Sequence, residues 1–347
     1  MSKLPFYSLL SGFYSHGANA VGFFFVLSGF VFYWLYSTNI HKRNIGLTNF
    51  CILRLSRLYP LQLFTLLLCV ALQWLAKPRL GADFVYQHDD LAHFVMNLFL
   101  VQFWGFQSGY SWNGPSWSIS VEIALYGLFF IGCLLLRPNL IQCFVFLLAA
   151  WSCAHLNLIG SAGIAFFSGG ACYWIFRSLA PRWKAKYQAL LLTFVVAAWC
   201  VIPHTAQESF VTQTVSNIYG FMGDNRLGHW FATFVKLLMQ RQNELLLFPI
   251  TVLALALTER TWHALPWRRL HEFGNLSFGI YLFHFPLQIA FVYLALKCGA
   301  KRDFFVEHST FVMFFCCLIS ISLVSYHFFE RPMMTWMRQR TMARNET

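Results

Sequence analysis

Long apolar runs alternate with short polar segments along the whole chain. Most runs are about as long as a helix that crosses a bilayer, which needs roughly 20 residues. A helix must satisfy its own backbone hydrogen bonds in lipid, so runs of this kind predict an all-α, polytopic transmembrane helix bundle. We predict about nine spans, at residues 18–37, 58–76, 116–136, 139–158, 161–177, 188–203, 244–258, 274–296 and 309–329. Two further apolar segments, 93–104 and 227–240, are expected to be interfacial or re-entrant helices.

The composition supports a membrane protein and gives no sign of a linker. Of the 347 residues, 58% are hydrophobic and only 11% are charged, whereas soluble domains carry about a quarter charged residues. The lipid bilayer is therefore the first predicted partner. We expect a single membrane domain over residues 1–347, with a loop at 1–17 and a basic tail at 330–347.

The net charge of +12 is explained by membrane orientation rather than by nucleic acid, because the chain has no nucleic-acid-binding motif. About two thirds of the lysines and arginines lie in the segments 38–57, 137, 177–187, 259–273 and 330–347, which places these segments and the C-terminus in the cytoplasm. The ten cysteines are scattered through apolar runs without a CxxC pair, as buried small side chains are.

The segment YQHDDLAHF, residues 86–94, combines two histidines with two aspartates. Metal ligation by His88, Asp89, Asp90 and His93 is one interpretation, but the spacing fixes no set of three ligands. Capping of a helix by Asp89 or Asp90 is the interpretation that we favour. We therefore predict no metal and no bound cofactor.

Two arginines begin the second predicted span, in RLSRLYPLQL. Arg54 and Arg57 are three residues apart and share a helix face. Two guanidiniums at the cytoplasmic end of a span can hold a phosphate group through charge-assisted hydrogen bonds. Ordinary anchoring at the membrane interface is the alternative.

A polar row follows the turn Asn113-Gly114-Pro115. Ser118, Glu122 and Tyr126 are spaced by four and fall on one face of the third span. An ionised carboxylate in hydrocarbon costs about 3 kcal/mol or more, so Glu122 must face a polar cavity or a partner helix. A structural hydrogen-bond network and an acceptor site both satisfy this requirement.

A second polar row, Ser277, Tyr281, His284 and Gln288, lies on one face of the eighth span. Near mid-membrane, His284 is either a hydrogen-bonded core residue or a general base. In the first span, Ser28-Gly29 permits close helix packing or the approach of a ligand's acyl or pantetheine-like arm.

These segments together resemble the acyltransferase 3 family of membrane O-acyltransferases. The resemblance covers residues 20–332 and rests on GFFFVLSGF, RLSRLYP, WSISVEIALYG, SFGIYLFHFP and FFERP, in that order. It implies a ten-span bundle in the bacterial inner membrane. The implied reaction moves an acetyl or other short acyl group from cytoplasmic acyl-CoA to a hydroxyl of a cell-surface or exported glycan, such as an exopolysaccharide or O-antigen.

The resemblance also assigns residues. Arg54 and Arg57 match the family's donor-binding pair, and Ser28, Gly29 and Phe30 match its Ser-Gly-Phe element. Trp117, Ser118 and Glu122 match the Trp-Ser-x-x-x-Glu element, beside which we place Tyr126 and Tyr281 as supporting residues. We expect Glu122 and His284 to line the catalytic cavity.

One family element is not matched. Family members carry a first span with an arginine and, eleven residues later, a histidine regarded as catalytic; here His16 has Pro5 at the arginine position. We therefore expect His284 to take a supporting or substitute role as the base. A shortened, inactive homologue and a transporter or flippase of lipid-linked glycan remain as alternatives.

Overall fold

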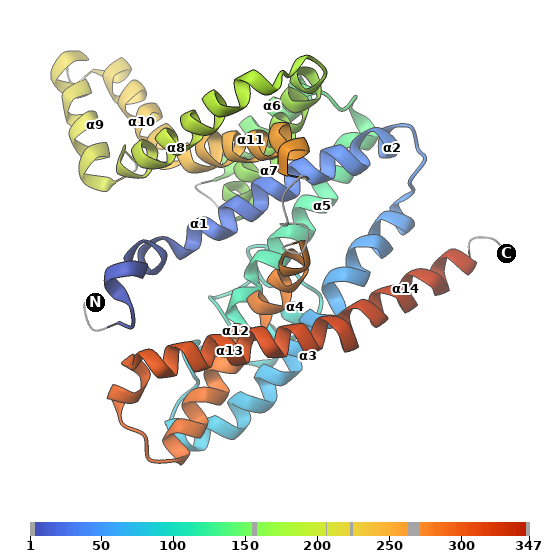
Figure 1. The fold of residues 1–347 in the computed structure, drawn as a ribbon, viewed down its shortest axis with the longest axis vertical. Coiled ribbons are helices and arrows are strands. Elements are labelled where there is room, and N and C mark those ends of the chain that lie inside the picture. The colour runs from blue at the N-terminus through green and yellow to red at the C-terminus, as the bar shows by residue number, and fades with distance from the viewer. Residues whose placement is uncertain (1–3, 155–157, 206, 223–224, 263–270, 345–347) are drawn as a thin grey trace. The chain divides into compact units, whose positions relative to one another are not determined.

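The described chain is helical, and it contains no strand among the residues that the structure covers, which confirms the all-α prediction. The computed structural model describes residues 4–154, 158–205, 207–222, 225–262 and 271–344 (Figure 1). The α-helices are α1 (Tyr7–Phe32), α2 (Thr38–His41), α3 (Leu47–Leu80), α4 (Leu91–Leu98), α5 (Trp117–Leu135), α6 (Leu140–Cys153), α7 (Leu158–Leu179), α8 (Gln188–Thr205), α9 (Glu208–Met222), α10 (Arg226–Gln240), α11 (Phe248–Trp262), α12 (His271–Lys297), α13 (His308–Ser325) and α14 (Arg331–Arg344). Three π-helical segments interrupt them: η1 (Tyr33–Ser37), η5 (Asn243–Leu247) and η8 (Tyr326–Glu330).

Seven helical segments of the described chain are long and apolar enough to cross a membrane. They correspond to seven of the nine predicted spans. Of the other two, 139–158 forms the shorter helix α6, with 14 residues, and 244–258 lies in η5 and α11, which follow each other directly from Asn243 to Trp262. A 14-residue helix is only about 21 Å long, which is shorter than the hydrocarbon layer.

The predicted loop at 1–17 was wrong, and the predicted basic tail is helical. Residues 1–17 were expected to be a loop, but α1 begins at Tyr7 and is interrupted by a kink at His16. The tail after residue 329 is also helical, because η8 joins α13 directly to α14. Both helices continue through residues that weaken a helix, Gly12 and Pro332, and extend beyond the apolar runs.

The described chain divides into two compact units, each assembled from segments far apart in the sequence. The first unit contains residues 1–16, 43–128 and 266–347, and the second contains 17–42 and 129–265. In the first unit, α12 packs on α3 through a buried cluster formed by Cys69, Ala76, Phe285 and Ile289. Helix α14 also lies alongside α3 (Figure 1), where Arg338 donates to the Ser56 hydroxyl and the Leu53 carbonyl.

In the second unit, α6 and α7 form an antiparallel pair, and α1 crosses α7 at two glycines. A Cβ atom on Gly29 would lie 1.8 Å from the Phe166 carbonyl oxygen, and one on Gly169 would lie 1.9 Å from the Val26 oxygen. Only glycine allows two backbones to approach this closely. The Ser-Gly element is therefore a helix-crossing point.

Candidate active site

The predicted polar row on α5 is present, and it connects to α12. A short 3-10 turn, Gly114–Ser116, positions the start of α5, and the buried Asn113 anchors this turn by donating to the Leu282 carbonyl. Ser118 Oγ donates to the Tyr281 hydroxyl over 2.9 Å. The Tyr281 hydroxyl in turn donates to the Pro115 carbonyl. Tyr281 therefore fixes α12 against the beginning of α5.

The carboxylate of Glu122 and the guanidinium of Arg54 meet at Tyr126, the last residue of the row. Tyr126 is buried and its hydroxyl donates to Glu122 Oε1. The Arg54 guanidinium carbon lies 5.9 Å from the centre of the Tyr126 ring, within cation–π range. We call Arg54, Ser118, Glu122, Tyr126 and Tyr281 the polar column.

Of the two predicted donor-binding arginines, Arg54 belongs to this column and Arg57 follows it by one turn of α3. They belong to the early turns of α3, which begins at Leu47. The charges of Glu122, Arg54 and Arg57 all act on the Tyr126 hydroxyl. Arg54 is half-buried, whereas Arg57 is exposed. Two guanidiniums at this end of the column suit an anionic ligand.

Glu330 was missed as a site residue, although FFERP contains it. It lies in the π-helical segment η8 and its Oε1 accepts from Ser325 Oγ over 3.0 Å. The charge of Arg57 acts on this carboxylate, and Gly279 of α12 leaves room for it, since a Cβ there would lie 3.3 Å from Glu330 Oε1. An acidic residue in an otherwise apolar run was the signal that could have identified it.

His284 lies one turn beyond Tyr281 on α12 and is half-buried. Its Nδ1 is hydrogen-bonded to the Tyr281 carbonyl. A carbonyl can only accept, so Nδ1 carries the proton and the lone pair of the neutral ring is on Nε2. This tautomer leaves Nε2 with the lone pair that a general base needs.

Trp117, Gly29 and Phe30 make packing contacts in the structure. The Trp117 ring lies 6.1 Å from that of Phe103. Phe30 is buried, with ring contacts to Trp34, Tyr173 and Phe176. Gly29 contacts the α7 backbone, so the structure favours the packing interpretation over the approach of an acyl arm at this glycine. Ser28, Gly29 and Phe30 belong to the second unit, whereas the polar column belongs to the first.

The YQHDDLAHF segment runs from a hydrogen-bonded loop into the first turn of α4. Asp90 caps α4 by accepting from the His93 N–H, as predicted, and also accepts from His93 Nδ1 over 2.8 Å. His93 Nε2 accepts from the Ser108 N–H, so both ring nitrogens already have protein partners. No group of three or more His, Cys, Asp or Glu side chains in the described ranges is arranged to hold a metal ion.

Asp89 is the residue of this segment whose pKa is raised. Its carboxylate accepts from Gln73 Nε2 over 2.9 Å and from the Trp112 N–H. Burial raises the pKa of Asp89 to about 6, and the hydrogen bond from Trp112 opposes this effect. The backbone N–H of His93 lowers the pKa of the neighbouring Asp90.

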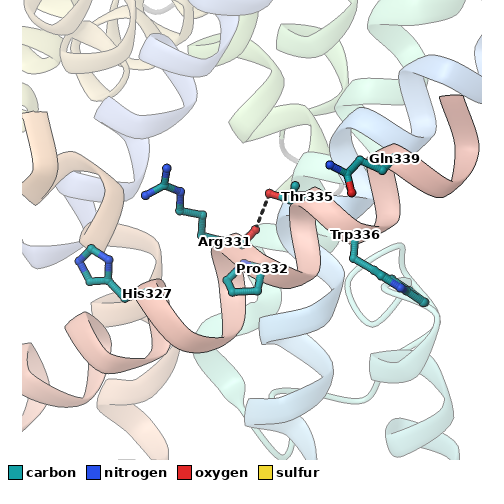
Figure 2. A pocket seen from close by; sticks show the side chains of 6 residues that line it. All are labelled: His327, Arg331, Pro332, Thr335, Trp336 and Gln339. Atoms are coloured by element: carbon teal, nitrogen blue, oxygen red, sulfur yellow. Dashed lines mark hydrogen bonds between the residues drawn. The ribbon is translucent and has the colours of Figure 1, made fainter. Parts of the chain in front are cut away.

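A pocket of about 430 Å³ lies along one face of η8 and α14. Figure 2 shows Arg331 extending away from its helix and Thr335 Oγ1 donating to the Arg331 carbonyl. The lining residues are His327, Arg331, Pro332, Thr335, Trp336 and Gln339. The pocket therefore combines a permanent positive charge with polar and aromatic side chains.

Comparison with known proteins gives two matches. The family model Acyl_transf_3, described as an acyltransferase domain, matches residues 2–336. The acyltransferase MdmB of Streptomyces mycarofaciens is 38% identical over 115 residues, which is 32% of this chain and 27% of that protein. The match thus spans about a quarter of the relative's length. No solved structure matches.

Proposed function

The chain belongs to the acyltransferase 3 family, and from that premise we propose that it transfers a short acyl group from acyl-CoA to a hydroxyl of a surface or exported glycan. The family and the apolar helices support a multi-pass membrane acyltransferase. The donor, the glycan acceptor, the bacterial inner membrane and the cytoplasmic C-terminus are parts of the proposal. The predicted charge asymmetry supports the orientation, because it places Arg54 and Arg57 on the cytoplasmic side, where CoA is.

The observation that carries the proposal is the polar column in the first unit. It brings a positively charged end, a carboxylate and two tyrosine hydroxyls together from α3, α5 and α12. Arg54 and Arg57 would bind the CoA phosphates.

The reaction joins the acceptor oxygen to the thioester carbonyl carbon and breaks the carbon–sulfur bond. In the proposed mechanism, Glu122, oriented by Tyr126, accepts a hydrogen bond from a neighbouring hydroxyl of the acceptor sugar and so positions the attacking hydroxyl. His284 Nε2 takes the hydroxyl proton as the new bond forms and returns it to the CoA sulfur as the thiolate leaves. Atoms and charge balance, and the products are the acyl ester and free CoA.

The test combines Arg54→Ala with Arg57→Ala in the purified full-length protein, supplied with radiolabelled acetyl-CoA and a glycan extract from the native cells. Charge-assisted hydrogen bonds contribute about 1.5–3 kcal/mol each, so the double variant should raise the KM for acetyl-CoA by at least ~10-fold. Arg79→Ala is the matched control, because Arg79 lies at the opposite end of α3, against Tyr293.

Three results would contradict the proposal in different ways. Unchanged transfer by the double variant would remove the donor role of the two arginines. Absence of labelled glycan with the wild-type protein would contradict acetyl transfer itself. The transporter alternative would be favoured if the protein moved glycan across the membrane of reconstituted vesicles without changing it covalently.

A further inference from the structure

Four consecutive polar residues lead into η5 and form its first two positions, in the second unit and directly before an apolar helix. They are Arg241, Gln242, Asn243 and Glu244, and we call them the η5 polar cluster. A π-helical segment widens the turn by one residue, and such segments occur frequently at functional sites. The cluster shares no residue with the polar column.

Side chains from neighbouring helices hold the cluster in place. Arg241 Nη2 donates to Ser161 Oγ of α7 over 3.0 Å, and Arg241 Nη1 lies 3.9 Å from Glu244 Oε1. Thr205 of α8 donates to Gln242 Oε1 over 3.0 Å. Ser168 of α7 donates to the Glu244 carbonyl over 2.7 Å. The orientation of the cluster is therefore set by two other helices.

Three neighbouring residues of this cluster each bury one polar atom that has no hydrogen-bond partner among the described protein groups. These atoms are Gln242 Nε2, Asn243 Oδ1 and Glu244 Oε2. A buried polar atom without a partner costs about 1–3 kcal/mol. The described residues contain ten such atoms, and only here do three consecutive residues each carry one. Native proteins contain few such atoms, so this run points to another molecule that supplies the partners.

The chemistry of the three atoms defines that molecule. One is a donor and two are acceptors, which complements groups that both donate and accept, as hydroxyls do. A metal ion is disfavoured by the Arg241 guanidinium beside Glu244, and a phosphate is disfavoured by the Glu244 carboxylate. Amide, carboxylate and guanidinium groups together suit neighbouring hydroxyls of a sugar.

We propose that the η5 polar cluster binds sugar hydroxyls of the glycan acceptor. This inference rests on the proposed function and specifies its acceptor side. The cluster lies at the start of the predicted span 244–258, at the end opposite to the basic segment 259–273, which the charge asymmetry places in the cytoplasm. The cluster is therefore on the outer side, where an exported glycan is present. The cluster would therefore select the acceptor, whereas Arg54 and Arg57 bind the donor.

The experiment uses Asn243→Leu and Glu244→Gln in the purified full-length protein, with Glu208→Gln as the matched control on the exposed surface of α9. Transfer from radiolabelled acetyl-CoA is measured against serial dilutions of the native glycan extract. We expect each cluster variant to raise the half-saturating extract concentration at least ~10-fold, because each removes a hydrogen bond to a charged or buried group. The KM for acetyl-CoA and the rate with Glu208→Gln should not change.

Thermal melting separates binding from folding. Without glycan, Asn243→Leu should melt no lower than the wild type, since it removes a buried acceptor without a partner. The extract should raise the melting temperature of the wild type and of Glu208→Gln but not that of the cluster variants.

The outcomes distinguish this inference from the proposed function. Unchanged glycan saturation and unchanged melting shifts in both cluster variants would overturn the site, while acetyl transfer would stand. If the wild type transfers no label but the extract still stabilises it through the cluster, the site stands and acetyl transfer fails.

Discussion

At the residue scale, Tyr126 is the point where the charged groups of the first unit meet. Its hydroxyl is bonded to Glu122, its ring lies under Arg54, and the charge of Arg57 also reaches it. A buried phenol between a carboxylate and two guanidiniums provides both an orienting hydrogen bond and apolar surface. This arrangement explains how a carboxylate is accommodated in an apolar helix.

His284 supplies a prediction at this scale. In His284→Asn the amide nitrogen takes the place of Nδ1, so the bond to the Tyr281 carbonyl is retained while the basic Nε2 is lost. General-base catalysis contributes roughly 10²–10⁴-fold. We expect kcat for acetyl transfer to fall within that range, with little change in the KM for acetyl-CoA.

The measurement is steady-state transfer of radiolabel at saturating glycan extract, across pH 5.5–8.5. His41→Asn is the matched control, because His41 Nδ1 is likewise bonded to a backbone carbonyl, that of Cys133. A kcat for His284→Asn within about twofold of the wild type would show that His284 is a structural residue.

At the element scale, close helix crossings decide the architecture of the second unit. Glycines at two points let α1 and α7 meet backbone to backbone. Where helices pack this tightly, even one methyl group must move a backbone. The Ser-Gly-Phe element is thus tied to helix placement, whatever ligand binds elsewhere.

Gly29→Ala tests this contact. The new Cβ would lie 1.8 Å from the Phe166 oxygen, so α1 and α7 must separate, at a cost of about 1–3 kcal/mol or more. We expect a lower melting temperature and less protein in the membrane fraction, measured by fluorescence-detected size-exclusion chromatography. Gly220→Ala is the control, since nothing lies within 4 Å of its Cβ position.

The control should be neutral or slightly stabilising, because alanine favours a helix over glycine by about 1 kcal/mol. Equal melting temperatures for Gly29→Ala and the wild type would mean that the two helices do not cross at this glycine.

At the scale of the whole molecule, many large apolar side chains face outward. Trp74 is 77% exposed, Leu148 64% and Phe328 80%. A soluble protein rarely exposes apolar surface to this extent, whereas lipid covers it at no cost. The outward apolar faces therefore support a bilayer as the surrounding medium.

The pH dependence of unfolding is a second property of the whole molecule, and Asp89 contributes to it. Its pKa is about 6 in the folded protein, above the value of 3.8 for an unperturbed aspartate. The folded state therefore holds the proton more tightly, and this contribution to stability is complete below pH ~4 and lost as pH rises through ~6.

Melting temperatures in detergent from pH 4 to 7.5 measure this effect. The wild type should lose stability between pH ~4 and ~6, and Asp89→Asn should have a smaller slope in this window. Asp303→Asn, at an exposed site, should retain the wild-type slope. An equal slope for Asp89→Asn and the wild type would contradict the assignment to Asp89.

The sequence by itself determined the helical class, seven spans of sufficient length, the polar row on α5 and the family. These features depend on local composition and on the 3.6-residue period, which places residues four apart on one face whatever the tertiary structure. The cap at Asp90 was likewise readable, because capping involves only the adjacent turn.

Only the tertiary structure decided which faces meet. Three interactions join segments more than 100 residues apart. They are the hydrogen bond between Ser118 and Tyr281, the electrostatic interaction of Arg57 with Glu330, and the backbone contact between Gly29 and Phe166. The η5 polar cluster could not be predicted from the sequence, because RQNE resembles the end of an ordinary solvated loop. Only the structure shows that polar atoms of this segment are buried. Periodicity determines which residues share a face, but the partner of that face depends on packing between distant segments, which no local pattern encodes.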